Sequence, residues 1–189
     1  MSPRRPMAVR QQGIALVTSL LLLIIVTILA LSLFRSFGSL ERIAGNMREK
    51  ERALHAAEAA QQYGEWWLLQ PANIAGGPIA CVPGTLNGTL GQGQICNAAP
   101  VNVSALPWVT VTTYLPAGMS VTPGVNGANG DPPYAQAPGI YIADLGPAAD
   151  GLGEAYQVDA YGYGGSTTSA AVVESTYEIQ QGVVNRGGL

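Results

Sequence analysis

The sequence predicts an α+β protein in which a long N-terminal helix, half of it transmembrane, packs on a small antiparallel β-sheet. Residues 14–34 form an apolar run without a single charge. Helix-favouring residues then continue without a proline until Pro71. From Pro71 onward the chain holds 20 of its 24 glycines and 11 of its 13 prolines, which excludes further long helices. Alternating β-branched and aromatic segments in this second part predict strands.

The apolar run from Ile14 to Phe34 has the length of a membrane-spanning helix. It contains 21 residues, which at 1.5 Å per residue extend about 31 Å, close to the hydrocarbon thickness of a bilayer of about 30 Å. Its polar side chains are all small hydroxyls: Thr18, Ser19, Thr27 and Ser32. A core helix of a soluble protein is rarely apolar on every side over this length, so we expect a transmembrane segment.

Two interpretations of the N-terminus are compatible with this run. Arg4, Arg5 and Arg10 precede it, as in the basic region of a secretory signal peptide, and the small residues of Ala30-Leu31-Ser32 would then mark the cleavage site. In the second interpretation the cut falls before the apolar run, at Gly13, and the helix stays on the mature protein. The length of the run favours the second, because the apolar part of a signal peptide usually has about 7–15 residues.

Helical signals continue beyond the apolar run, through residues 35–70. Apolar and small residues recur every three or four positions, and Ala53–Gln62 is rich in strong helix formers. We therefore predict one helix from Ile14 to about Leu69, roughly 84 Å long, whose Ala/Tyr/Trp face packs on the sheet. The charged residues between them, Glu41, Arg42 and Arg48–Arg52, are predicted to form a solvated or intersubunit face, and Gly38, Gly45 and Gly64 to be weak points.

Residues 71–189 are predicted to form the β-domain. Four segments have the alternation expected of strands: Trp108–Leu115, Gly139–Leu145, Ala155–Tyr163 and Ala170–Ile179. Turn-rich loops separate them, and the four alternating segments with seven tyrosines after residue 100 favour a small antiparallel sheet over a disordered tail.

Cys81 and Cys96 are the only cysteines. Two cysteines without a nearby histidine do not supply the four ligands of a structural zinc site. A disulfide is favoured over two free buried thiols; it would close a loop of about 15 residues and contribute about 3 kcal/mol in the chain-entropy model. Because disulfides persist in oxidising compartments, the β-domain is expected outside the cytoplasm.

The charge distribution and the single histidine exclude several classes of function. The net charge of −3 divides into +5 for residues 1–52 and −8 for residues 53–189, so the β-domain offers no basic face for nucleic acid. His55 is expected to serve packing or solvation rather than catalysis. The Asn126–Asp131 segment lacks the spaced carboxylates and the terminal glutamate of a calcium loop, and Gly162–Gly165 lacks the lysine of a phosphate loop. We predict no enzyme, no cofactor and no metal.

Two further aromatic residues, Trp66 and Trp67, are expected to anchor the sheet on the helix rather than to form a binding surface.

Several motifs together resemble the PilX family of minor type IV pilins. They are the basic leader ending at Gly13 with Ile14-Ala15-Leu16-Val17 after it, the string Ile43–Arg48, the alanine-rich Ala56–Ala60, and the closing segment from Tyr156 to Tyr177. The resemblance implies that residues 1–13 are a prepilin leader cut by prepilin peptidase, with methylation of the new terminus at Ile14. It implies a transmembrane half-helix at 14–34, a periplasmic half at 35–70 and a globular β-domain at 71–189.

One position departs from the pilin pattern. Pilins usually carry glutamate at the fifth mature position, where it is thought to pair with the N-terminus of a neighbouring subunit; counted from Ile14, this position is Thr18. Thr18, Leu22 and Ile25 are predicted to belong to the helix surface used in assembly. The absence of a carboxylate suits a subunit used once, at the tip or in the priming complex.

We therefore predict a minor pilin that primes assembly or sits near the pilus tip and supports twitching motility and adhesion. The resemblance implies other minor pilins, the major pilin, a tip adhesin, the inner-membrane assembly platform and prepilin peptidase as partners. The protein would reside in the inner membrane and then in the pilus. The alternatives are a type II secretion pseudopilin and an unprocessed membrane-anchored periplasmic binding protein; an exported enzyme is more distant.

Overall fold

A computed structural model describes residues 12–83, 86 and 94–180. The chain divides into two compact units, residues 1–45 and residues 46–189, which are considered separately below. The predicted leader, residues 1–13, lies mostly outside the described residues.

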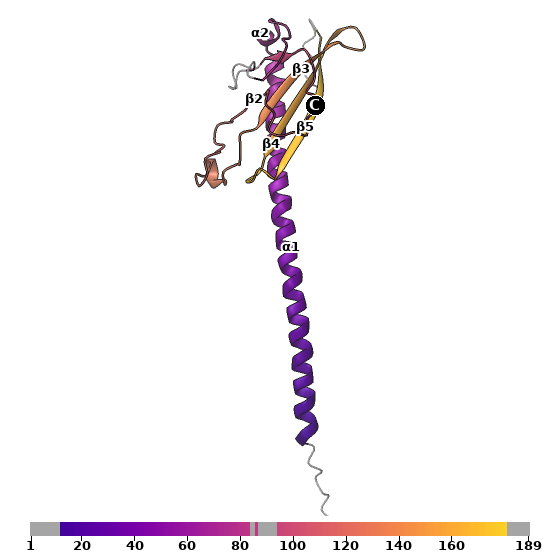
Figure 1. The fold of residues 1–189 in the computed structure, drawn as a ribbon, viewed down its shortest axis with the longest axis vertical. Helices are drawn as coiled ribbons and strands as arrows, with labels where there is room; N and C mark the ends of the chain where they lie inside the picture. The colour runs from indigo at the N-terminus through magenta and orange to yellow at the C-terminus, as the bar shows by residue number, and fades with distance from the viewer. Residues whose placement is uncertain (1–11, 84–85, 87–93, 181–189) are drawn as a thin grey trace, which may run out of the picture. The chain divides into compact units, whose positions relative to one another are not determined.

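The first element is α1 (Gln12–Leu68), one continuous α-helix (Figure 1). Its extent confirms the prediction of a single helix from Ile14 to about Leu69. In the first unit the large apolar side chains of α1 are exposed: Leu16 is 67% and Phe34 is 73% accessible. By length and composition, α1 is the one helix of the described residues that could cross a bilayer.

The second unit contains the rest of α1, the short helix α2 (Pro71–Ile74), the 3₁₀ turn η2 (Ala128–Gly130) and a five-stranded sheet. The strands are β1 (Ile95–Cys96), β2 (Thr112–Thr113), β3 (Gly139–Pro147), β4 (Gly153–Tyr163) and β5 (Ala170–Gln180). Their order is β1-β3-β4-β5, with β2 also on β3. Three of the four predicted strands are present as β3, β4 and β5 with boundaries within a few residues.

The sheet is mixed, which corrects the prediction of an antiparallel one. β1 runs parallel to β3, whereas β2, β4 and β5 join by antiparallel pairing. A parallel pair needs a long connection, and residues 97–138 between β1 and β3 provide it. A two-residue strand carries no alternation pattern, so β1 could not be found from the sequence.

The predicted strand Trp108–Leu115 is reduced to the two residues of β2. The reason is competition for the same edge of β3: β1 pairs with Ile142 and Ala143, and β2 pairs with Ile140 and Gly139. Each short strand therefore finds only a few hydrogen-bonding partners.

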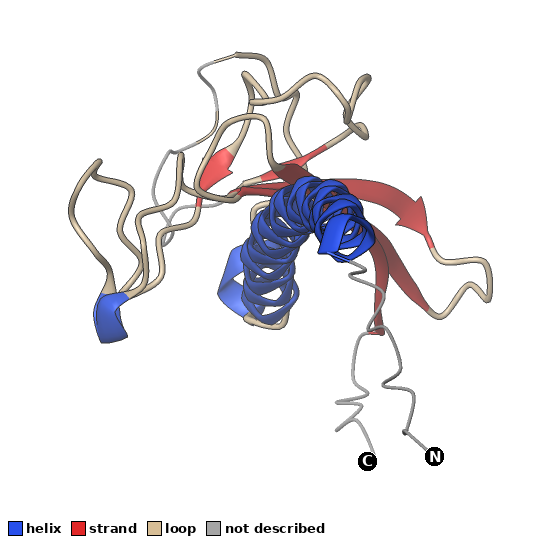
Figure 2. Cartoon of the chain, turned by 90° about the horizontal axis from the view of Figure 1, so that it is seen from below, coloured by secondary structure: helices blue, strands red, loops and turns tan. Residues whose placement is uncertain are grey.

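One face of the sheet packs against α1, as Figure 2 shows. The contact is made by small residues: Ala53, Ala57 and Ala60 are fully buried. A Cβ added to Gly162 of β4 would lie 2.6 Å from both the Ala53 carbonyl oxygen and the Ala57 nitrogen. A Cβ on Gly64 would lie 2.8 Å from Val158 Cγ1. Gly64 is thus a point of close approach to the sheet, not the weak point that helix propensity predicts.

Above this contact lies the helix-side core, the larger cluster of buried residues on the α1 face of the sheet. Its buried members are Ala60, Trp67, Leu68, Ile95, Ile140, Ile142, Tyr156, Val158 and Ala160. Even-numbered residues of β3 and β4 supply this face, as the period of two in a strand requires.

The opposite face of the sheet carries a second cluster, the loop-side core. It comprises Cys96, Trp108, Tyr141, Ala143, Tyr161 and Tyr163, with partly buried loop residues such as Val103 and Leu106 packed against it. Trp108 meets Tyr161 edge-to-face with ring centroids 5.0 Å apart, and its indole N–H donates to the Val103 carbonyl at 3.0 Å. The long β1–β3 connection therefore covers the face that α1 does not.

The close approach at Gly162 predicts a specific sensitivity. Gly162→Ala should lower the free energy of unfolding by about 1–3 kcal/mol, because the added methyl group meets helix backbone that has no room to move. Urea unfolding of the detergent-solubilised full chain, followed by tryptophan fluorescence, measures it. Gly76→Ala is the control, since its Cβ would enter open space, and should change stability by less than about 0.5 kcal/mol. Equal midpoints for Gly162→Ala and wild type would contradict this packing.

Candidate assembly site on the N-terminal helix

The predicted processing junction lies in the first turn of α1. Gly13 and Ile14 are both helical, and no heavy atom outside the immediate helix lies within 4 Å of a Cβ built on Gly13. Ile14 is 68% exposed. Within the described residues of the first unit, the junction is therefore sterically open.

The hydroxyl groups of the apolar run are satisfied inside the helix. Thr18 Oγ1 is 3.0 Å from the carbonyl oxygens of both Ile14 and Ala15. Ser19, Thr27 and Ser32 donate to carbonyls three or four residues earlier at 2.8–3.0 Å. Unsatisfied polar groups are costly in hydrocarbon, so these bonds make the whole run compatible with lipid or with neighbouring helices.

Thr18, Leu22 and Ile25 follow one another at spacings of four and three, so they share one face of α1. Leu22 is 63% and Ile25 is 47% exposed. The Thr18 hydroxyl has its bond within its own helix and so, unlike a carboxylate, needs no charged group from a neighbour. The first unit thus presents an apolar surface that needs no ionic partner at Thr18.

Of the charged residues predicted to form a solvated or intersubunit face, Arg48, Lys50 and Glu51 are exposed, whereas Glu49 and Arg52 are half-buried. Glu49 accepts a hydrogen bond from the Gly165 N–H in the β4–β5 turn and pairs with Arg52 at 3.1 Å. The Gly165 N–H, and next to it Arg52, hold the pKa of Glu49 below its ordinary value. Lys50 Nζ donates to the Ala170 carbonyl at 3.1 Å. Glu49, Lys50 and Arg52 thus fasten α1 to one end of the sheet.

Arg52 also reaches the long β1–β3 connection. Its Nη2 donates to the Pro132 carbonyl at 2.7 Å, and its guanidinium lies 4.4 Å from the centre of the Tyr134 ring. Gly164 lies close to the backbone of α1. Glycine is needed there, because a Cβ would lie 2.6 Å from the Glu49 carbonyl oxygen. The Gly162–Gly165 segment is therefore explained by packing on α1, which agrees with rejecting it as a phosphate loop.

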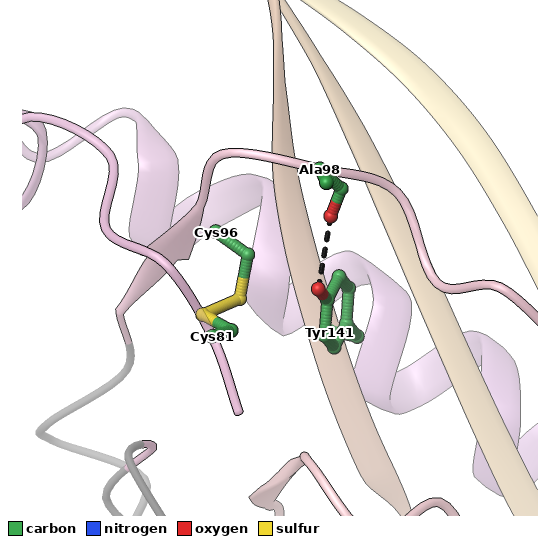
Figure 3. The surroundings of a disulfide bond; sticks show 4 residues. All are labelled: Cys81, Cys96, Ala98 and Tyr141. Atoms are coloured by element: carbon green, nitrogen blue, oxygen red, sulfur yellow. Dashed lines mark hydrogen bonds between the residues drawn. A yellow bond between two sulfur atoms is a disulfide. The ribbon is translucent and has the colours of Figure 1, made fainter. Parts of the chain in front are cut away.

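The expected disulfide joins Cys81 to Cys96, with the Cα atoms 5.3 Å apart (Figure 3). It holds residues 79–81 beside β1, where the Ile79 N–H donates to the Ile95 carbonyl at 2.9 Å. Next to it, the Tyr141 hydroxyl donates to the Ala98 carbonyl at 2.9 Å. The bridge thus secures the two-residue strand that the sequence did not reveal, and a loop of this size contributes about 3 kcal/mol.

Asp159 is a fully buried carboxyl group at the centre of the sheet. It stands between Tyr141 of β3 and Glu174 of β5 in the strand register. The Gln157 amide donates to its two oxygens at 3.1 and 3.0 Å. Burial raises the pKa of Asp159 to about 6; Glu174 adds to this rise and the Gln157 amide opposes it. No basic side chain pairs with Asp159 in the described part of the chain.

The other residues weighed for chemistry stay apart. His55 is exposed and lies 3.3 Å from Glu58 on the same helix. Residues 12–83, 86 and 94–180 contain no group of three His, Cys, Asp or Glu side chains placed to hold a metal ion. The prediction for the tryptophan pair is half right: Trp67 is buried in the helix-side core, but Trp66 is 54% exposed and leans on Tyr63 at 5.3 Å.

Comparison with protein families gives two matches along the chain. Residues 12–61 match the PilX N-terminal domain, and residues 92–179 match the C-terminal domain of type IV pilus assembly protein PilX. The chain belongs to the PilX family of type IV pilus assembly proteins. Neither a curated protein nor a solved structure matches it. The PilX N-terminal match covers the apolar run and the buried alanines Ala53, Ala57 and Ala60, and the C-terminal match covers β1 to β4 and β5 up to Ile179.

The PilX family is one of pilus assembly components and is not a known enzyme family. The apolar first half of α1 accords with membrane anchoring and pilus association. The sequence resemblance is thus confirmed at the level of the family and of the pilin-like fold. Sequence reasoning missed two features of this PilX chain: the fastening role of Glu49, Lys50 and Arg52, and the burial of Asp159. Neither has a local signal, because the contacts of Glu49, Lys50 and Arg52 reach residues 80–120 positions away along the chain and the burial of Asp159 depends on the cross-strand register.

The buried carboxyl group predicts an unusual pH dependence. The folded pKa of Asp159, about 6, exceeds its ordinary 3.8, so its stabilising contribution is complete below about pH 4 and is lost as the pH rises to about 6. Asp159→Asn should therefore raise the free energy of unfolding at pH 8 by about 2–3 kcal/mol and have little effect at pH 4. Urea unfolding of the full chain in detergent at both pH values measures this difference.

The exposed Asp131→Asn serves as the control for this experiment and should change stability by less than about 0.5 kcal/mol at either pH. A destabilised Asp159→Asn protein at pH 8 would show that the carboxylate is instead a net stabilising group.

Proposed function

We propose that this PilX-family protein is a minor type IV pilin that primes pilus assembly or sits near the pilus tip, and thereby supports twitching motility and adhesion. The observation that carries the proposal is the first half of α1, an uncharged apolar surface whose hydroxyls are all bonded within the helix. Such a helix can wait in a bilayer and then exchange lipid for neighbouring helices without exposing an unsatisfied polar group.

The proposed life of the protein begins with an uncut precursor in the inner membrane. Residues 1–13 form the leader, residues 14–34 the transmembrane half-helix, residues 35–70 the periplasmic half and residues 71–189 the globular β-domain. The disulfide between Cys81 and Cys96 supports a periplasmic β-domain, since such bonds persist in oxidising compartments. Prepilin peptidase removes the leader, and the mature subunit joins other minor pilins, the major pilin and a tip adhesin at the inner-membrane assembly platform.

The Thr18 position supports a subunit used once. A fibre subunit repeated along a shaft uses a carboxylate there to pair with the N-terminus of its neighbour, as the pilin pattern implies. Thr18 instead satisfies its hydroxyl within its own helix. A subunit at the outer end of the fibre has no earlier subunit to pair with, so threonine carries no penalty at that place.

The leader boundary gives a first prediction of this proposal. The chain should be cut between Gly13 and Ile14, and the new N-terminus should be methylated. Gly13→Trp should block the cut, because a bulky side chain replaces the smallest one at the junction. The intact mass of membrane-extracted protein measures both, with Gly38→Ala, far from the junction, as a matched variant that is still processed. An uncut wild-type chain in cells with active prepilin peptidase would favour the unprocessed membrane-anchored protein.

The single-use position gives a second prediction. The wild-type protein should be a trace component of sheared pili, its deletion should reduce the number of pili, and Thr18→Glu should bring no gain in incorporation. The introduced carboxylate would lie unpaired in hydrocarbon, at a cost of about 2.5–3.5 kcal/mol on insertion scales. Quantitative mass spectrometry of sheared fibres measures the abundance. Abundance close to that of the major subunit would contradict the minor role, and recovery with a secretion filament would favour the pseudopilin.

A further inference from the structure

The strand β5 is the terminal strand of the sheet, and its outer edge has no partner strand within the described residues. It is 11 residues long and pairs with β4 in one unbroken register from Ala170 to Gln180. Figure 1 shows it at the margin of the sheet. Its sequence contains no proline, lysine or glycine, and its pairing contains no bulge. Most of the devices that proteins use to blunt an exposed edge are therefore missing.

The strand register shows which backbone groups face this edge. The Gly164 N–H donates to the Ser169 carbonyl at 2.8 Å, and these two residues continue the β4–β5 register by one pair. In an antiparallel pair the hydrogen-bonded positions alternate, so the odd-numbered residues of β5 bond to β4. The even-numbered residues, from Val172 to Glu178, direct their N–H and carbonyl groups outward.

The contact made by Lys50 agrees with this assignment. Its ammonium group bonds the carbonyl of Ala170, an even-numbered residue, at 3.1 Å. Lys50 therefore closes the edge at the start of β5. The outward groups of Val172, Glu174, Thr176 and Glu178 form the remaining stretch, which we name the β5 edge.

The side chains along the β5 edge define the chemistry of a strand that would fit it. On the face of the loop-side core, Glu174 and Glu178 are exposed and stand four residues apart. On the α1 face, Val173 and Ile179 are partly buried and pack on the helix-side core. An added strand would thus place basic residues opposite the two glutamates and apolar residues on the α1 face, where they would extend the core.

A second copy of this chain is a poor occupant of the β5 edge. Residues 53–189 carry a net charge of −8, so two β-domains repel each other. A two-fold pairing centred on Thr176 would also place Glu174 directly opposite Glu178, and one centred on Glu174 would pair that residue with itself. Like charges directly opposite one another destabilise a strand pair.

We propose that the β5 edge binds an extended, amphipathic strand of another pilus subunit. This strand carries basic residues four positions apart, opposite Glu174 and Glu178, and apolar residues at the positions between them that face α1. The strand adds to the sheet by main-chain hydrogen bonds, and the two glutamates select its charge. The proposal rests on the proposed assembly function only in taking the partner to be a pilus subunit; strand addition itself is tested on the purified chain, independently of processing or pilus abundance.

The test uses the full chain in detergent micelles and a capped peptide of sequence VKVTVKV, which reads the same in both directions. Amide hydrogen exchange is followed by NMR. Without peptide, the amides of Val173, Ser175 and Tyr177 should be protected and those of residues 172, 174, 176 and 178 should exchange freely. Saturating peptide should slow the second set by at least about tenfold, and the peptide VEVTVEV should not.

Two variants separate backbone pairing from charge. Thr176→Pro removes an outward N–H but leaves the bonds to β4 in place, and should weaken binding by about tenfold; Thr176→Val, which keeps the N–H, should bind like wild type. Replacing both Glu174 and Glu178 by glutamine should weaken binding by about fivefold and remove most of its salt dependence. Retained protection at Ser175 in each variant reports that the sheet is intact.

Three results would overturn the proposal. The first is a failure of VKVTVKV to protect the even-numbered amides, or protection elsewhere in the chain. The second is protection without peptide that grows with protein concentration, which would assign the edge to a second copy. The third is protection without peptide that disappears when residues 181–189 are deleted, which would assign it to the end of this chain.

Discussion

The second unit depends on the close contact between the small residues of α1 and the glycine-bearing strand β4. The distances at Gly162 leave no space for even one methyl group between β4 and the helix backbone at Ala53 and Ala57. Further along the helix, Ala60 and Gly64 lie against Ala160 and Val158, where the larger side chains of the helix-side core begin. Because protein interiors are close-packed, this spacing fixes where every other side chain of that core must sit.

Charged side chains complete the same contact at its end. Glu49 and Lys50 bind the two sides of the β4–β5 turn, and Arg52 reaches the β1–β3 connection at Pro132 and Tyr134. These groups are partly exposed, so their value lies less in stability than in fixing the register between helix and turn. These contacts hold the β-domain to the adjacent segment of α1. In an assembly protein, β5 and the loops therefore keep a defined orientation relative to that segment.

The buried Asp159 differs from the small and apolar residues that make the other buried contacts, because it is a carboxyl group. A carboxyl group without a basic partner costs stability once ionised, and in this position it faces Glu174 across the strand pair. A partner that brings positive charge to Glu174 would relieve part of this repulsion. The exposed glutamates of β5 and its open edge therefore belong to one region of the second unit.

Elements with strong local signals can be predicted from the sequence alone. The uncharged run from Ile14, the helix to Leu68 and the strands β3, β4 and β5 all follow from hydrophobic periodicity and composition, and the PilX family follows from motifs within them. The cysteine pair was accessible in the same way, because only one pairing exists.

Strand direction, strand length and close contacts between distant residues follow only from the tertiary structure. β1 can run parallel to β3 because the long connection 97–138 joins them, and β1 occupies positions 142 and 143 of the edge along which β2 would otherwise extend. The role of Gly64 reversed from weak point to close contact once Val158 was placed beside it. Local propensity describes a residue's effect on its own helix or strand, but burial, pairing partners and an open edge arise only when separate segments meet.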